Sequence, residues 1–262
     1  MHLNRIALGI EYNGSAYNGW QCQKHGLGVQ EVVEKALSFV ANEPVKVVCA
    51  GRTDSGVHAA GQVVHFDSQV IRDDRAWLMG TNSRLPDNIA VNWAKPVTEE
   101  FHARFSALKR YYRYVIANQP VRPAILDRLV SWDYRRLDVS RMQTAANYLL
   151  GEHDFSSYRA IKCQAKNPVR TIYRLEVSRC GDYIFIDIEA NAFLHHMVRN
   201  IAGVLMAIGA GEKAEQWAGE VLGYRDRTLG GITAPPNGLY FMQVTYPEVF
   251  AIPNTVAEGL FP

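Results

Sequence analysis

The sequence predicts an α+β fold made of two tandem ferredoxin-like halves, each with the element order β-α-β-β-α-β. Short runs rich in β-branched residues alternate with longer runs whose apolar residues recur at helical spacing. The same order of runs occurs twice along the chain, with no evident linker between them. We therefore expect the halves to form one mainly antiparallel sheet, with helices on one side and a cleft between the halves.

The first half is predicted to span residues 1–104. Residues 5–11 are expected to form a strand, and residues 29–42 a helix with its valines, alanines and leucine on one face. Strands are then expected near 45–50 and 61–67, a helix near 73–83 and a strand near 89–95.

The second half is predicted to span residues 105–262, including a tail after residue 247 that lies over the surface. Its predicted elements are a strand at 111–118, a helix near 140–150, a hairpin over 172–190 that turns at Gly181-Asp182, a helix over 194–211 closed by Gly209 and Gly211, a short helix near 214–223 and a strand near 239–246.

The composition is typical of a globular protein without a membrane span. The 262 residues are 48% hydrophobic and 21% charged, and no apolar run approaches the ~20 residues that cross a bilayer. The N-terminal apolar run is too short for a signal peptide. Four scattered cysteines without CxxC spacing suit reduced thiols. We expect a cytoplasmic protein.

Two basic stretches lack acidic residues, although the net charge is only +2. One is "RFSALKRYYRY" at residues 104–114, and the other is "RAIKCQAKNPVR" with the residues that follow it, to 174. Basic residues interleaved with aromatic ones favour nucleic acid as the partner. The alternative is two solvated faces whose acidic partners come from elsewhere in the chain.

The stretch "CAGRTDSGVH" places Asp54 in a glycine-bracketed loop between two predicted strands. Such loops often display functional groups. The simpler interpretation is an Asx-turn, in which the carboxylate caps its own backbone.

Other catalytic arrangements are not supported by the sequence. The adjacent His195 and His196 would point in different directions from a helix, and no HExxH motif or Cys/His cluster occurs, so we expect no metal. Phosphate-loop, GxGxxG and GxSxG motifs are missing as well. A lone nucleophilic carboxylate at Asp54 remains, with Arg52 or Arg199 as the cation that keeps it ionised.

Several strings in order resemble one family. "IEYNGSAYNGWQ", "GRTDSGVHA", "FHARFSALKRYYRYVI", "NAFLHHMVRNIAG" and "GLYFMQV" together resemble TruA-type tRNA pseudouridine synthases, from residue 5 to about residue 247. The resemblance implies isomerisation of uridine to pseudouridine at positions 38, 39 and 40 of the tRNA anticodon stem-loop. It also implies no cofactor, no metal and a homodimer across which tRNA lies.

The resemblance also assigns roles to residues. Asp54 is the expected nucleophile or base, Tyr112 stacks on the flipped uracil and is suited to handle its C5 proton, and Arg199 pairs with Asp54. Leu239 is expected to line the uracil pocket. One departure is Cys22, at a position where many members carry a basic residue.

The remaining predicted site residues would bind substrate. Arg52 and His58 are expected to shape the Asp54 loop and contact RNA, and Arg110 and Arg113 to contact phosphate. The main alternative function is a non-catalytic RNA-binding protein with a ferredoxin-like sheet. No RNP1-like string is present, and a binder has no reason to place an acid in a basic groove.

Overall fold

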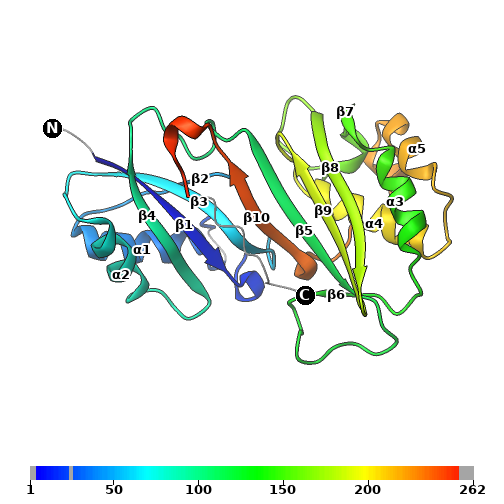
Figure 1. Ribbon diagram of the computed structural model, residues 1–262, viewed down its shortest axis with the longest axis horizontal. Coiled ribbons are helices and arrows are strands. Elements are labelled where there is room, and N and C mark those ends of the chain that lie inside the picture. Colours follow the sequence, from blue (N-terminus) through cyan, green and yellow to red (C-terminus); the bar gives the residue numbers. More distant parts are fainter. Residues whose placement is uncertain (1–3, 24–25, 254–262) are drawn as a thin grey trace. The chain divides into compact units, whose positions relative to one another are not determined.

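The computed structural model describes residues 4–23 and 26–253 (Figure 1). The chain divides into two compact units, of which one contains the residues up to Leu108 together with those from Tyr240 onward, and the other contains Lys109–Leu239. The predicted boundary between halves after residue 104 stays a prediction.

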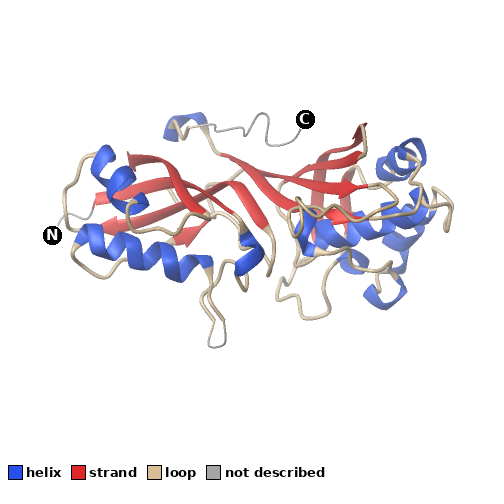
Figure 2. Cartoon of the chain, turned by 90° about the horizontal axis from the view of Figure 1, so that it is seen from below, coloured by secondary structure: helices blue, strands red, loops and turns tan. Residues whose placement is uncertain are grey.

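The first unit has the strand order of a ferredoxin-like half. Its strands lie in the order β4-β1-β3, and β2 also pairs with β3. The elements are β1 (Asn4–Tyr12), α1 (Val29–Ala41), β2 (Val48–Cys49), β3 (His58–Ser68), α2 (Asp74–Asn82) and β4 (Ile89–Val97). The pairs that β1 makes with β3 and β4 are antiparallel. Figure 2 shows α1 running alongside these strands.

The helices of this unit form where the sequence predicts them. On α1, Val29, Val33 and Leu37 are fully buried, because their spacing places them on one face. The α2 helix starts at a capping residue, since Asp73 Oδ1 accepts a hydrogen bond from the Ala76 amide at 2.6 Å. Its Trp77 packs edge-on against Phe66 of β3.

A strand from the far end of the chain completes the first unit. This strand, β10 (Leu239–Thr245), pairs in parallel with the start of β3 through Tyr240 opposite His58 and Phe241 opposite Ala59. The approach is close: a Cβ added at Gly61 would lie 2.1 Å from the Met242 carbonyl oxygen. Glycine is therefore required at this position of β3.

The second unit contains a mainly antiparallel set of strands in the order β5-β9-β8-β7, with β6 parallel to β5. Its elements are β5 (Lys109–Ala117), β6 (Ser131–Trp132), α3 (Val139–Asn147), β7 (Gly151–Asp154), β8 (Val169–Cys180), β9 (Tyr183–Ala190), α4 (Met197–Gly209) and α5 (Trp217–Tyr224). Helix α3 packs against α4 and β8. The hairpin of β8 and β9 turns at Gly181, whose φ is 56°.

The predicted fold class, α+β with mainly antiparallel strands, is confirmed. The structure differs from the predicted elements in detail. The strand expected at 45–50 is only Val48–Cys49, and the short strands β6 and β7 were not predicted. Two-residue and four-residue strands are too short to show a period in the sequence. None of the described helices is long and apolar enough to cross a membrane.

Candidate functional site

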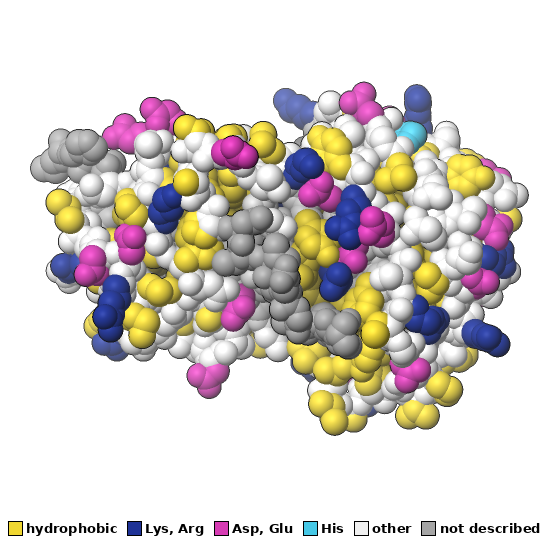
Figure 3. Space-filling model, in the orientation of Figure 1, with side chains coloured by type: hydrophobic (Ala, Val, Ile, Leu, Met, Phe, Trp, Pro, Cys, Tyr) yellow, Lys and Arg dark blue, Asp and Glu magenta, His cyan; other side chains and the backbone are white. Residues whose placement is uncertain are grey.

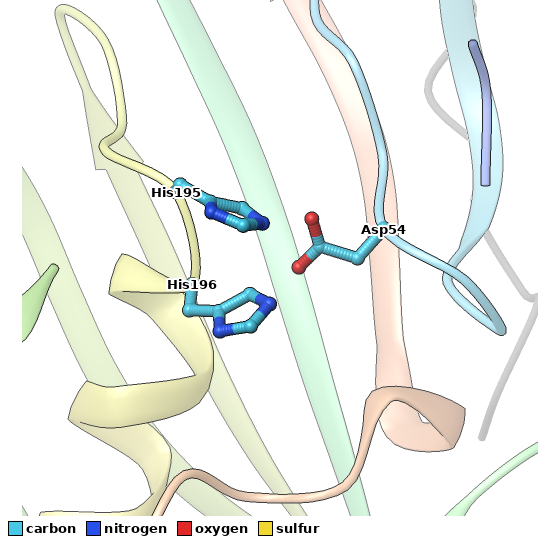
Figure 4. Close-up of side chains that lie close together, drawn as sticks. All are labelled: Asp54, His195 and His196. Atoms are coloured by element: carbon cyan, nitrogen blue, oxygen red, sulfur yellow. The ribbon is translucent and has the colours of Figure 1, made fainter. Parts of the chain in front are cut away.

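The loop that carries Asp54 is tied to the segment that follows β1. The Tyr12 hydroxyl and Thr53 Oγ1 lie 2.7 Å apart within the core, and the Trp20 amide donates to the Thr53 carbonyl at 3.0 Å. Thr53 is buried, whereas Asp54 is partly exposed. Figure 4 shows the Asp54 side chain and the loop that carries it. The backbone immediately before the carboxylate is thus held on two sides.

Glycines allow this close approach. Gly19 has a φ of 89°, and a Cβ there would lie 2.6 Å from the Thr53 carbonyl oxygen. At Gly14 a Cβ would lie 1.9 Å from the Val57 carbonyl oxygen. Only residues without a side chain fit at these two places. The glycines of "YNGSAYNGWQ" are therefore explained by the loop against which they pack.

The base of the loop is closed by Gln62, which is fully buried. Its Nε2 donates to the Gly51 carbonyl at 2.6 Å, and its Oε1 accepts from the Gly51 amide at 3.4 Å. At the tip, the Val57 amide donates to the Asp54 carbonyl at 3.1 Å, which closes a tight turn. The loop is therefore ordered at both its base and its tip.

His58, the first residue of β3, is buried inside the first unit and contacts Gly14 and Tyr240. Its Nδ1 accepts a hydrogen bond from the Gly14 amide at 3.1 Å, so that nitrogen carries no proton. The ring stacks on Tyr240 with 4.6 Å between centroids and is only 1% exposed. The predicted role of His58 in shaping the loop stays a prediction. The predicted RNA contact of His58 stays a prediction, as does that of the exposed Arg52.

The second unit carries the predicted stacking tyrosine. Tyr112 on β5 lies opposite Ile188 of β9, and its ring meets Phe193 edge-on with 5.0 Å between centroids. Arg110, two residues earlier on the same face of β5, donates from Nη1 to the Asn191 carbonyl at 2.8 Å. Phe193 and Asn191 belong to the "NAFLHHMVRNIAG" string, which did not by itself show that they would contact β5.

The opposite face of β5 is occupied by paired charges. Arg113 forms a two-pronged ion pair with Asp187, with Nε–Oδ1 at 2.8 Å and Nη2–Oδ2 at 3.0 Å. The Asp187 hydrogen bond raises the pKa of Arg113. Lys109 pairs with Glu189, and Arg174 pairs with Glu176. Figure 3 shows basic and acidic side chains interspersed over this face.

These pairs bear on the two acid-free basic stretches. For Lys109, Arg113 and Arg174 the acidic partners come from β8 and β9, as the solvated-face alternative expects. The phosphate contact of Arg113 stays a prediction, but its guanidinium is already held by a buried carboxylate. Arg110 faces the other way, on the side of Tyr112.

Arg199 lies in the first turn of α4. Its Nε donates to the Ala234 carbonyl at 2.9 Å, and its own carbonyl accepts from the Ala234 amide at 3.1 Å. A Cβ at Gly203, one turn later, would lie 1.8 Å from the Ile232 carbonyl oxygen, so this helix face packs directly on a loop backbone. The loop that contains Ala234 therefore holds the Arg199 side chain through the hydrogen bond at Nε.

The two histidines considered above for a metal, and the predicted site residue Leu239, can also be placed within the second unit. His195 and His196 immediately precede α4 (Figure 4), and His196 has a φ of 62°. Leu239, at the start of β10, is 5% exposed. Its role in lining a uracil pocket stays a prediction.

Sequence reasoning missed the residues that hold these groups. Tyr12 and Gln62 fix the Asp54 loop, and Asn200 of α4 forms a polar cluster with Arg227. The one available signal was the polar character of Gln62 inside the strand "GQVVHF". A polar residue at a core position is usually hydrogen-bonded. Here the partner of Gln62 is the backbone of Gly51, in the loop that carries Asp54.

The family model and the similar proteins carry the same description. A family model described as tRNA pseudouridine synthase matches residues 9–106 and 145–247. A protein of Pseudomonas aeruginosa (strain PAO1) named tRNA pseudouridine synthase A is 58% identical over 253 residues, covering 96% of this chain and 89% of the relative. A protein of Nitrosococcus oceani with the same name is 59% identical over 250 residues, covering 95% of this chain and 96% of the relative.

A third relative of that name, from Coxiella burnetii (strain Dugway 5J108-111), is 57% identical over 250 residues, covering 95% of this chain and 96% of its own. Among solved structures, "Crystal Structure of a Cbf5-Nop10-Gar1 Complex" aligns with a TM-score of 0.36 and 13% identity, covering 90% of this chain and 48% of that chain. That similarity is too low to carry an argument.

Proposed function

Because the chain belongs to the tRNA pseudouridine synthase family, whose members isomerise uridine in tRNA, we propose that it modifies the anticodon stem-loop at positions 38, 39 and 40. The resemblance in the sequence supports these positions. The observation that carries the proposal of a catalytic site is the Asp54 loop, which is fixed by buried hydrogen bonds from Tyr12, Trp20 and Gln62.

The reaction begins with removal of the target uridine from its stack. Unstacking and unpairing one base costs a few kcal/mol. Stacking of the extruded uracil on an aromatic ring returns roughly 1–3 kcal/mol. We assign this role to Tyr112, whose ring is braced edge-on by Phe193 and so is held in one orientation.

Asp54 then assists cleavage of the N1–C1′ bond, either by attacking C1′ or by removing a sugar proton. The freed uracil rotates and rejoins the sugar through C5. The C5 proton is lost and N1 gains a proton, so the reaction needs no cofactor and no external oxidant. Tyr112 is suited to handle the C5 proton through its hydroxyl.

Arg199 is proposed to hold the Asp54 carboxylate in its ionised form. The Ala234 carbonyl fixes the arginine Nε, which orients the planar guanidinium and limits its rotamers. An arginine stays protonated and positively charged at all working pH values. It therefore favours the ionised form of a neighbouring carboxylate throughout that range. We further propose that the enzyme is a cytoplasmic homodimer.

Asp54→Asn tests the proposal. Asparagine is nearly isosteric, and the loop is held by the backbone of Gly51 and by Thr53, so melting behaviour should be unchanged. An amide cannot act as the nucleophile or base, so pseudouridine formation should become undetectable while tRNA affinity stays equal to or above wild type. The matched control is Asp87→Asn, an exposed acid of the same unit, which should retain full activity.

A second measurement separates catalysis from the alternative of a non-catalytic RNA-binding protein. Release of tritium from C5-labelled uridine in unmodified tRNA is expected for the wild-type protein. Binding without release would support the non-catalytic alternative, and turnover by well-folded Asp54→Asn protein would remove Asp54 from the mechanism.

A further inference from the structure

A cavity of about 470 Å³ lies in the second unit beside the start of α4. Its lining includes Lys162, His195, His196, Arg227, Thr228 and Thr233, and none of its lining residues is acidic. The catalytic roles proposed above use none of these residues. A cavity lined by cationic groups without carboxylates is suited to an anion.

Arg227 is the central cation of this cavity. Its Nη2 donates to Asn200 Oδ1 at 3.0 Å and to Thr233 Oγ1 at 2.8 Å, and both partners are neutral. Burial lowers the pKa of Arg227, because the charge loses water. Within the described residues no carboxylate pairs with it. A cation in this situation is stabilised when an anion binds.

The arginine is also oriented in advance. Asn200 is 2% exposed, its Nδ2 donates to the Tyr158 carbonyl at 2.7 Å, and its Oδ1 accepts from Thr233 Oγ1 at 2.6 Å. This network fixes which side of the amide faces Arg227. A buried polar network that is fully satisfied is rigid, so the guanidinium is preorganised.

Lys162 contributes a second positive charge to the lining of the cavity. The Ala160 amide donates to the His195 carbonyl at 2.8 Å, which ties this loop to the start of α4. The Cys163 amide donates to the Ala160 carbonyl at 2.9 Å, and this turn presents the exposed Lys162. No described carboxylate pairs with Lys162.

The nearest acid in sequence is occupied elsewhere. Asp226 accepts hydrogen bonds from the Thr228 amide and hydroxyl, each at 2.8 Å, and these bonds lower the pKa of Asp226. The carboxylate thereby caps the short turn Arg227–Leu229. It holds the turn that carries Arg227 and is not paired with the guanidinium.

We propose that this cavity binds a backbone phosphate of the tRNA, close to the nucleotide that is isomerised. The inference rests on the proposed function. Thr233 directly precedes Ala234, whose carbonyl holds Arg199, so the cavity adjoins the proposed catalytic arginine. A phosphodiester is always anionic and matches the fork of an arginine and the point charge of a lysine.

The first test compares two exposed lysines of the same unit. Lys162→Ala should weaken binding of an unmodified tRNA transcript about threefold to tenfold at moderate salt, and reduce the slope of log affinity against log salt by about one. Lys213→Ala is the control, since Lys213 is exposed but does not line the cavity. Equal behaviour of the two variants would overturn the proposal.

The second test concerns Arg227, whose alternative role is only to tie its turn to Asn200. Arg227→Gln keeps an amide donor for Asn200 and Thr233 but removes the charge. We expect a reduced salt slope, with the exposed Arg136→Gln as the charge-matched control. A lowered melting temperature with an unchanged slope would show the purely structural role.

The third test identifies the ligand as a phosphate. Single methylphosphonate linkages are placed around the target uridine of a stem-loop RNA, and binding is measured with wild type and Lys162→Ala. At one linkage, neutralisation should weaken binding to wild type about threefold to tenfold and have no effect on the variant. Additive losses at every linkage would overturn the phosphate assignment.

These outcomes are distinguishable from failure of the proposed function. The binding measurements need no turnover, whereas the proposed function is tested by pseudouridine formation in the wild-type protein. If the wild-type enzyme is active but no methylphosphonate linkage loses its effect in Lys162→Ala, only the assignment of the cavity as a phosphate site is overturned. If one linkage loses its effect in Lys162→Ala but the wild-type protein forms no pseudouridine, the proposed activity is overturned and the phosphate site stands.

Discussion

At the scale of single residues, substitution can separate the roles proposed for the hydroxyl and for the ring of Tyr112. The ring is 8% exposed and braced by Phe193, so removing only the hydroxyl leaves its packing intact. We expect Tyr112→Phe to bind tRNA like wild type and to form pseudouridine at least about a hundredfold more slowly, the size typical of a lost acid or base.

Single-turnover kinetics with saturating enzyme measure this effect on the chemical step. Tyr112→Ala is the comparison, because it also removes the stacking surface and should weaken binding. A phenylalanine variant with wild-type turnover would assign the C5 proton to another group.

Two neighbouring arginines of β5 should differ in their effects. Arg110 lies on the Tyr112 face, whereas Arg113 is committed to Asp187, which is only 4% exposed. We expect Arg110→Gln to reduce the salt slope of tRNA binding by about one. Arg113→Gln removes the cation that pairs with the buried Asp187 carboxylate, although the Tyr111 hydroxyl still donates to that carboxylate, and should cost about 3–5 kcal/mol of folding stability.

Filter binding over a salt series and urea unfolding measure the two quantities. Because the variants remove the same charge from the same strand, each serves as the control for the other. If Arg113→Gln reduces the salt slope of tRNA binding and leaves folding stability unchanged, the predicted phosphate contact of Arg113 is supported.

At the scale of elements, the loop after β1 and the loop before β3 are joined by hydrogen bonds and by close packing at glycines. Gly19→Ala places a Cβ 2.6 Å from the Thr53 carbonyl at a φ of 89°. We expect a stability loss of about 2 kcal/mol or more and at least a tenfold fall in turnover, because the Asp54 backbone must move.

Gly181→Ala is the matched control. Gly181 also has a positive φ, of 56°, but a Cβ there would have no neighbour within 4 Å. The substitution should cost about 1 kcal/mol of stability through backbone strain alone and leave turnover unchanged. Equal losses of activity in both variants would show a general effect of stability.

The strand β3 also carries a pH-sensitive residue. Burial, together with His102 and Arg5, lowers the pKa of His65 to about 4, and its Nδ1 accepts from the Ala103 amide at 3.1 Å. Since the unfolded chain binds this proton at higher pH, stability is full above about pH 6.5 and falls as pH drops toward 4.

We expect His65→Gln to lose this part of the pH dependence, which should be on the order of 1–3 kcal/mol between pH 7 and pH 4. The Arg5 hydrogen bond lowers the pKa of Asp67, which also destabilises the fold in acid, but both proteins share that effect. Urea unfolding at several pH values gives the difference. Parallel curves would show that His65 does not titrate on unfolding.

At the scale of the whole molecule, the elements were more predictable than the contacts between them. The apolar period of α1 and the glycine turn of the β8–β9 hairpin are local signals, and both are confirmed. The position of Asp54 on a loop between strands is also local. Such features depend on neighbouring residues, which a sequence displays directly.

Contacts between distant segments were not predictable in the same way. Nothing near Arg113 indicates that its partner is Asp187, and nothing near His58 indicates that Tyr240 stacks on it. Strand pairing decides both, and it depends on the register of segments far apart in the chain. The local charge around Arg113 was therefore a weaker guide to its contacts than the apolar period was to the fold.

The parallel pairing of β10 with β3 has a consequence for biosynthesis. The first unit needs a strand from near the end of the chain, whereas the second is one continuous stretch. On the ribosome, the aspartate loop emerges early, yet the ring that covers His58 is translated only after the entire second unit. Nascent chains that end before Tyr240 therefore lack both the β10 pairing and the ring that stacks on His58.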